Sequence, residues 1–175
     1  MVYLYTMKTH LIAAMCEGRG IGNKGSIPWH SPEDLRFFSR TTRGKGNNAV
    51  VMGMNTWRSI GEKPLSRRTN IILSRTAVDV PLAHVCASIE AVDHLCASAN
   101  FDEVWIIGGA QIYSEYLRRE KIDECYITQI QGTYECDTFF PQMGNEWTSF
   151  RFLSTDDFYV ERWTTAQSMS KSGLS

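Results

Sequence analysis

The chain has 175 residues, of which 43% are hydrophobic and 21% are charged, a composition typical of one globular domain rather than two. Its 18 basic and 19 acidic residues give a formal net charge of −1, which does not favour binding to nucleic acid or to a membrane surface. No apolar run approaches the ~18 residues of a membrane span, and no secretory leader is recognisable. We therefore expect a soluble, cytoplasmic protein.

The cysteines and histidines do not form a metal-binding pattern. The five cysteines are an odd number without a Cys-x-x-Cys pair, and the four histidines are scattered without a His-Glu-x-x-His cluster. We therefore expect free, buried thiols in a reducing compartment and no protein-bound metal.

Apolar, β-rich runs alternate with helical patterns along most of the chain. In chain order the sequence predicts strand His10–Cys16, helix Pro32–Thr41, strand Ala49–Gly53, helix Thr56–Ile60, strand Asn70–Ser74, strand Val85–Ala87, helix Ser88–Ala99, strand Glu103–Ile107, helix Gln111–Leu117, strand Glu124–Ile130 and a hairpin of Thr148–Thr155 with Phe158–Thr165. This order predicts an α/β fold, in which a mostly parallel sheet carries helices on both faces and ends in an antiparallel hairpin. No linker interrupts residues 7–165, so we expect one domain there and loose termini at residues 1–6 and 166–175, the tail from Thr164 onward lacking periodicity.

A glycine-rich stretch follows the first strand. Gly20-Ile21-Gly22-Asn23-Lys24-Gly25 matches the dinucleotide fingerprint Gly-x-Gly-x-x-Gly, but no helix begins at its third glycine and no acidic residue follows at the required distance. We therefore reject the Rossmann interpretation. The segment Glu17–Ser31 is then a long loop, either an ordinary surface connection or a flexible lid that carries Ile27 and Trp29.

Ser31-Pro32-Glu33-Asp34 is a helix start with a serine N-cap, and Asp34 has two interpretations. It can be a capping partner near the positive end of the helix dipole. Alternatively, its i,i+4 neighbour Phe38 places the carboxylate beside the apolar face of the helix, where burial raises the pKa of a carboxyl group and favours a ligand-binding or proton-handling role. Glu33 is expected to face solvent.

Small residues follow two of the predicted strands where helices begin. Gly53 precedes Thr56 after one strand, and Gly108-Gly109 follows another, so two helix N-termini could each bind an anion. With Arg75 after a third strand, they suggest a pocket for a long polyanion such as a dinucleotide. Arg67 and Arg68 form a separate basic point, which is either functional or a solvated loop charge.

The motifs along about residues 9–165, taken together, closely resemble those of dihydrofolate reductase. They are Leu11-Ile12-Ala13-Ala14, Gly20-Ile21-Gly22, Pro28-Trp29, Asp34-Leu35 with Phe38, Val51-Met52-Gly53 with Thr56-Trp57, Ser59-Ile60, Arg68 with Asn70-Ile71-Ile72-Leu73-Ser74-Arg75, Ile106-Ile107-Gly108-Gly109 with Tyr113, Thr128, and Asp137-Thr138 with Phe140-Pro141. The resemblance implies hydride transfer from NADPH to dihydrofolate, with antifolate-type molecules as further ligands and a monomeric state.

The resemblance also implies site residues. Asp34 would hold the 2-amino group and ring nitrogen of the pterin with Thr128 as its companion, Trp29 would order a nearby water, and Arg68 would pair with the glutamate α-carboxylate. Asp34, Trp29 and Ile27 are the implied catalytic residues. The remaining implied substrate-binding residues are Ile12, Leu35, Phe38, Ile60, Leu65 and Ile107.

The same resemblance implies the cofactor site. The implied NADPH-binding residues are Ala14, Ile21, Gly22, Ser26, Ile27, Gly53, Asn55, Thr56, Leu73, Ser74, Arg75, Ile107, Gly108, Gly109, Ala110, Gln111, Ile112 and Tyr113. Ser74 and Arg75 would contact the adenosine phosphate, and the Gly108–Gly109 bond would be cis as in the family. Met54-Asn55 departs from the family pattern, which has a basic residue just after the strand glycine, so one phosphate contact of about 1–2 kcal/mol is missing.

Two other functions are compatible with parts of this pattern. One is a related pyrimidine or pterin reductase of the same fold, and the other is a non-catalytic folate- or NADPH-binding module. The combination of Asp34, Thr128 and Arg68 argues against the first, and the complete site argues against the second.

Overall fold

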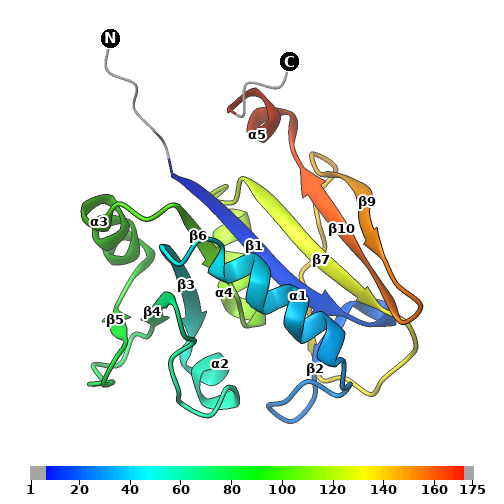
Figure 1. The fold of residues 1–175 in the computed structure, drawn as a ribbon, viewed down its shortest axis with the longest axis horizontal. Helices are drawn as coiled ribbons and strands as arrows, with labels where there is room; N and C mark the ends of the chain where they lie inside the picture. Colours follow the sequence, from blue (N-terminus) through cyan, green and yellow to red (C-terminus); the bar gives the residue numbers. More distant parts are fainter. Residues whose placement is uncertain (1–6, 172–175) are drawn as a thin grey trace.

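Runs of apolar and β-branched residues form the central strands, as the sequence predicts. The structure, a computed structural model, describes residues 7–171 (Figure 1). Its elements are β1 (Lys8–Met15), η1 (Glu17–Arg19), β2 (Gly20–Gly22), α1 (Pro32–Arg43), β3 (Asn48–Gly53), α2 (Met54–Ser59), β4 (Arg68–Leu73), β5 (His84–Cys86), α3 (Ile89–Ala99), β6 (Glu103–Ile106), α4 (Ala110–Arg118), β7 (Glu124–Ile130), β8 (Thr138–Phe139), β9 (Thr148–Ser154), β10 (Phe158–Thr164) and α5 (Ala166–Lys171).

The main sheet has eight strands in the order β5-β4-β3-β6-β1-β7-β10-β9. The strands from β5 to β7 pair in parallel, while β10 runs antiparallel to both β7 and β9. The predicted mostly parallel sheet with an antiparallel C-terminal hairpin is confirmed. Because β1 lies between β6 and β7, the ends of β1, β3, β6 and β7 lie near one another, and this is where ligands gather on parallel sheets.

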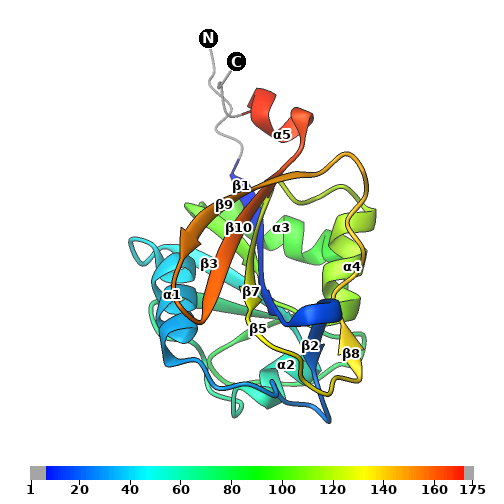
Figure 2. The same cartoon turned by 90° about the vertical axis from the view of Figure 1, so that its right-hand side faces the viewer.

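Helices cover both faces of the sheet, as predicted. Figure 2 shows α1 on one face and α3 and α4 on the other. Two hydrophobic clusters correspond to these layers: one contains Phe37 of α1 and Trp57 of α2, and the other contains Val92 of α3 and Tyr116 of α4. Strands such as β3, buried along almost their whole length, supply residues to both clusters, which explains their continuous apolar sequence.

Two predictions about irregular segments are wrong. The Glu17–Ser31 segment contains η1 and β2, and β2 pairs with β8 to form a second, two-stranded sheet. The tail predicted to be loose at residues 166–175 instead forms α5 over Ala166–Lys171, where buried Ser168 accepts a hydrogen bond from the Thr165 backbone N–H at 2.9 Å. The predicted loose segment at residues 1–6, and residues 172–175 of the tail, lie outside the described residues.

Within residues 7–171, no helix is long and apolar enough to span a membrane. The five cysteines are free; four are buried and Cys136 is half-buried, so the expectation of buried thiols fails for Cys136.

Candidate active site

The first turn of α1 directs one carboxylate into the protein. Ser31 is the N-cap, and its hydroxyl accepts a hydrogen bond from the Asp34 backbone N–H at 3.3 Å. Glu33 is exposed, as predicted, whereas the Asp34 side chain is buried with 9% of its surface exposed. As the third residue of α1, Asp34 lies in the first turn of the helix, on the side that faces the sheet.

The Asp34 carboxylate is paired with a buried threonine. The Thr128 hydroxyl on β7 donates a hydrogen bond of 2.8 Å to Asp34 Oδ1. Burial raises the pKa of Asp34 above its ordinary value, and the hydrogen bond from Thr128 opposes this only in part. The carboxylate is therefore buried and bonded to the sheet, which is the setting that the second interpretation, a carboxylate beside an apolar face, describes.

The neighbours of this pair belong to one apolar cluster, which includes Phe37 of α1 and Val160, the β10 partner of Thr128. Ile12 and Ile107 are buried members of the cluster, and further side chains pack against it from partly exposed positions. The residues expected from sequence that the structure brings together here are Ile12, Ala14, Trp29, Phe38, Ile60, Leu65 and Ile107. Leu35, by contrast, is 55% exposed.

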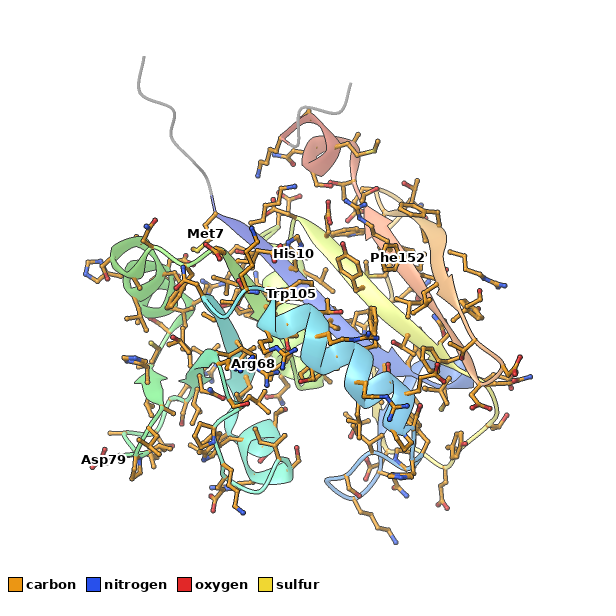
Figure 3. The ribbon with its side chains drawn as sticks, viewed as in Figure 1. Met7, His10, Arg68, Asp79, Trp105 and Phe152 are labelled. Atoms are coloured by element: carbon orange, nitrogen blue, oxygen red, sulfur yellow. The ribbon has the colours of Figure 1, made fainter. Side chains whose placement is uncertain are left out.

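Arg68 begins β4 and is fixed near the end of α1 (Figure 3). Its Nη1 donates a hydrogen bond of 2.9 Å to the Thr42 hydroxyl, and its Nε donates one of 2.9 Å to the Ser66 carbonyl. Partial burial, together with the nearby charge of Arg43, lowers the pKa of Arg68. An arginine is nevertheless always charged, so this is an oriented cation rather than the solvated loop charge that was the alternative.

The loop before Arg68 is also held in place by a side chain. The buried Asn70 amide accepts a hydrogen bond from the Leu65 backbone N–H and donates to the Leu65 carbonyl, both at 2.9 Å. Asn70 therefore positions Leu65 against the apolar cluster. Thr42 and Asn70 were not assigned these roles from sequence, because contacts between side chains distant in the sequence leave no local pattern.

Glycines occupy the carboxyl ends of the adjacent strands β3 and β6. The Gly53 backbone N–H donates to the Gly108 carbonyl at 2.8 Å, and a Cβ at Gly53 would lie 3.2 Å from the Ile112 side chain. Among the described helices, α1 and α3 are capped by Ser31 and Ser88, whereas the N-cap residues of α2 and α4, Gly53 and Gly109, have no side chain to cap them. Their first backbone N–H groups are therefore available to an anion.

The Gly108–Gly109 peptide bond is cis, as the resemblance implies. Gly108 has a φ of 116°, and a Cβ there would lie 3.1 Å from the Tyr113 hydroxyl, so only glycine fits. The buried Tyr113 hydroxyl donates to the Ile12 carbonyl at 2.7 Å, which ties α4 to β1. Tyr113 belongs to the hydrophobic cluster on the α3 and α4 face of the sheet, and the partly buried Ile21, Leu73 and Ile112 pack against that cluster.

Ser74 and Arg75 follow β4 at the next strand end. The Ser74 hydroxyl donates to the Thr76 carbonyl at 3.1 Å and accepts from the Thr76 backbone N–H at 3.3 Å, so it organises a tight turn. Arg75 is exposed. The other expected cofactor residues that are exposed are Ser26, Ile27, Asn55 and Gln111, while Gly22, Thr56, Gly109 and Ala110 are half-buried.

The segment after β2 carries an exposed apolar side chain and a packed aromatic ring. Ile27 is 56% exposed, whereas Trp29 packs on the apolar cluster and meets Tyr134 edge-on, with ring centroids 5.6 Å apart. Sequence reasoning missed Tyr134, since it lies in a segment without periodicity. No helix follows Gly25, and α1 begins only at Pro32, which agrees with rejection of the Rossmann interpretation.

Comparison with known proteins decides the family. The family model described as dihydrofolate reductase matches residues 8–164, almost the entire described chain. The chain belongs to the dihydrofolate reductase family. It is 36% identical over 160 residues to the dihydrofolate reductase of Drosophila melanogaster, covering 86% of each chain, and 40% identical over 142 residues to that of Haemophilus influenzae, covering 81% of this chain and 84% of the relative. A relative from Aedes albopictus is 36% identical over 164 residues, covering 86% of each chain.

Membership of the dihydrofolate reductase family makes the chain an oxidoreductase of folate metabolism that uses a nicotinamide cofactor. The sequence-based recognition of the family is thus confirmed. Within the described residues, no group of three or more His, Cys, Asp and Glu side chains is placed to hold a metal ion.

Proposed function

We propose that this protein reduces 7,8-dihydrofolate to 5,6,7,8-tetrahydrofolate with NADPH, supplying one-carbon and thymidylate metabolism, and that residues 7–165 act as one domain. The observation that carries the proposal is the buried Asp34–Thr128 pair at the start of α1, together with Arg68, which is hydrogen-bonded to Thr42 at the other end of the same helix. A carboxylate at one end and a fixed guanidinium at the other suit a ligand with a hydrogen-bonding ring and an acidic tail. We propose a monomeric, cytoplasmic enzyme that also binds antifolate-type molecules.

At the ring end, Asp34 would bind the 2-amino group and ring nitrogen of the pterin, with Thr128 fixing its Oδ1. Ile12, Phe38 and Ile107 would enclose the ring and exclude water. A negative charge in such a setting favours a protonated pterin, and its field is strong because few water molecules screen it. We propose that Asp34 acts electrostatically, while a water near Trp29 delivers the proton to N5.

At the tail end, Arg68 would bind the α-carboxylate of the glutamate through two parallel N–H···O bonds. Its hydrogen bonds to Thr42 and Ser66 already restrict the side chain, so binding costs little additional conformational entropy. Ile60, Leu65 and the exposed Leu35 would contact the segment between ring and tail.

The residues at the strand ends fit a nicotinamide dinucleotide. The uncapped starts of α2 and α4 lie at adjacent strands, and a Cβ at Gly109 would meet only the Thr56 hydroxyl at 3.7 Å, so the backbone is open to a pyrophosphate. A bound nicotinamide supplies the hydride. Ala14, Ile21 and Ile27 would contact the nicotinamide end, and Ser74 with Arg75 would contact the adenosine phosphate.

Arg75 is proposed to give the preference for NADPH over NADH. We expect Arg75→Ala to weaken NADPH binding by about 1.5–3 kcal/mol, because a charge-assisted bond to the 2′-phosphate is lost. NADH lacks that phosphate, so its binding should change little. Titration calorimetry with both cofactors measures the difference, and equal losses would contradict the assignment.

Within Glu17–Ser31, the segment that the sequence offers as a lid, residues 17–22 form η1 and β2, and we propose that residues 23–31 form the lid over the nicotinamide. We expect its backbone amides to exchange with solvent deuterium more slowly when NADP and a folate analogue are bound together, because closure removes Ile27 from water. Mass spectrometry of the exchanged peptides measures this effect. If exchange is unchanged at saturation with both ligands, the segment is an ordinary surface loop.

The test of the proposed function is dihydrofolate-dependent oxidation of NADPH, followed by absorbance against a control without substrate. We expect turnover with dihydrofolate. Turnover only with another ring would favour a related pyrimidine or pterin reductase, and saturable binding of both ligands without turnover would favour the non-catalytic module.

A further inference from the structure

Two cysteines that are distant in the sequence have their sulfur atoms in contact. Cys16 follows β1 and Cys136 precedes β8, and their Sγ atoms are 3.8 Å apart. Both thiols are free. A disulfide bond is about 2.05 Å long, so the sulfurs need to approach by only about 1.8 Å, a distance that small side-chain rotations can supply.

A glycine leaves room for this contact. A Cβ at Gly20 would lie 2.4 Å from Cys136 Sγ and 3.1 Å from Cys16 Sγ. The φ of Gly20 is −68°, which any residue adopts, so the backbone does not require glycine there. Space for the two thiols is therefore the structural reason for glycine at this position.

The two thiols differ in their access to solvent. Cys16 is 1% exposed, whereas Cys136 is half-buried and lies in a largely exposed segment. Desolvation and the hydrogen bond with Cys16 raise the pKa of Cys136. A dissolved oxidant therefore reaches Cys136 first, and because the pKa of this thiol is raised, the reaction is slow at neutral pH.

We propose that Cys16 and Cys136 are a redox-responsive modification site that forms an intramolecular disulfide with a low-molecular-weight disulfide as oxidant. The Cys136 thiolate attacks the small disulfide, which forms a mixed disulfide and releases one small thiol. Cys16 then loses its proton and attacks Cys136 Sγ, which breaks the mixed disulfide and releases the second small thiol. Two protein thiols are oxidised, and one small disulfide is reduced to two thiols.

The crosslink joins the two sides of the β2–β8 sheet. Strands β2 and β8 lie side by side (Figure 2). Gly20 pairs with Phe139 and Gly22 with Thr138, and the Lys24 backbone N–H donates to the Asp137 carboxylate at 2.9 Å. The bond would therefore fix the base of the segment that carries Ile27 and Trp29. This consequence rests on the proposed function, in which that segment is a lid, whereas formation of the bond does not.

The experiment treats the full chain with oxidised glutathione at mildly alkaline pH and analyses the intact protein and its peptides by mass spectrometry. We expect the loss of two hydrogen atoms and a peptide that links Cys16 to Cys136, both reversed by dithiothreitol. A stable glutathione adduct on Cys136 without a crosslink would overturn the proposal, as would oxidation of Cys86 or Cys96 at the same rate.

Variants separate the two steps. Cys16→Ser should accumulate the glutathione adduct on Cys136, and Cys136→Ser should leave Cys16 unmodified because that thiol is buried. Gly20→Ala should prevent the crosslink by displacing the Cys136 sulfur. The matched control Cys86→Ser should form the crosslink like the parent, and its failure to do so would contradict a specific pair.

Activity is measured on the same samples. We expect the crosslinked protein to turn over dihydrofolate at least about fivefold more slowly, since about fivefold is the low end of the coupling between two linked sites in proteins. Reduction of the disulfide should restore the turnover rate. A crosslink that leaves turnover unchanged would overturn the regulatory role. If the reduced protein has no reductase activity, the proposed function fails, and mass spectrometry still tests the disulfide.

Discussion

Asp34→Asn is expected to lower the rate of hydride transfer about 30-fold to 1000-fold. The substitution preserves shape, and the amide oxygen can still accept from Thr128, but the negative charge that favours a protonated N5 is lost. Such a charge in a water-poor site contributes ~2–4 kcal/mol to transition-state stabilisation. Single-turnover kinetics with NADPH and dihydrofolate measure the rate directly.

The stability of the same variant provides a control for the role of Asp34. The pKa of Asp34 is raised in the folded protein, so the folded state binds the proton more tightly than the unfolded state. The contribution of Asp34 to the free energy of unfolding is therefore largest below its pKa in the unfolded chain. This contribution is lost as the pH rises from that value through the pKa of Asp34 in the folded protein, whereas Asn does not titrate and has no such loss. We expect Asp34→Asn to be more stable than the parent at neutral pH, with a difference that shrinks on acidification.

Denaturant unfolding at several pH values measures this difference. An Asn variant that is less stable than the parent at every pH would contradict the burial account. A variant with unchanged stability and near-parental turnover would identify Asp34 as a simple capping residue, since Asn is an equally good cap.

Arg68→Ala is expected to raise the KM for dihydrofolate about 100-fold. Two charge-assisted bonds to the glutamate α-carboxylate are lost, and together they contribute about 3 kcal/mol. A pterin substrate without the glutamate has no carboxylate to lose, so its KM should change little. Steady-state kinetics with both substrates measure the contrast.

Arg67→Ala is the matched control for this prediction. Arg67 is adjacent in sequence but exposed, with a left-handed φ of 58°. We expect its removal to leave both KM values near those of the parent. If Arg68→Ala raises the KM of the two substrates equally, the role of Arg68 is to support the fold near Thr42 rather than to bind the glutamate tail.

Local patterns were sufficient to predict the sheet and most helices. A buried strand such as β3 is a nearly continuous apolar run, and α1 has a serine cap and Pro at its first position, so each is encoded within its own segment. The two-stranded sheet of β2 and β8 was not predictable in this way. Its short strands come from segments more than 100 residues apart and lack alternating apolar residues, so only the folded chain brings them together.

Features of the candidate site that depend on the position of a single residue were predictable from the sequence. Contacts between two side chains distant in the sequence were not. Asp34 was identifiable from its position beside Phe38, and the glycines from their places after strands. The Thr42–Arg68 and Cys16–Cys136 contacts join residues 26 and 120 positions apart, so local sequence patterns did not predict either contact. The helix α5 was missed because its Ser- and Gln-rich sequence has weak helical periodicity, and hydrogen bonds between Thr165 and Ser168 start it instead.

The most direct test of the account is the pH dependence of hydride transfer in single turnovers of the parent protein. The proton must be available at N5 when the hydride arrives, and Asp34 favours the protonated pterin, so the rate should decline as pH rises. Asp34→Asn should be slow at neutral pH and recover in part at low pH, where the pterin is protonated in solution. A parental rate that is independent of pH, or an Asn variant as fast as the parent at neutral pH, would contradict the proposed role of Asp34.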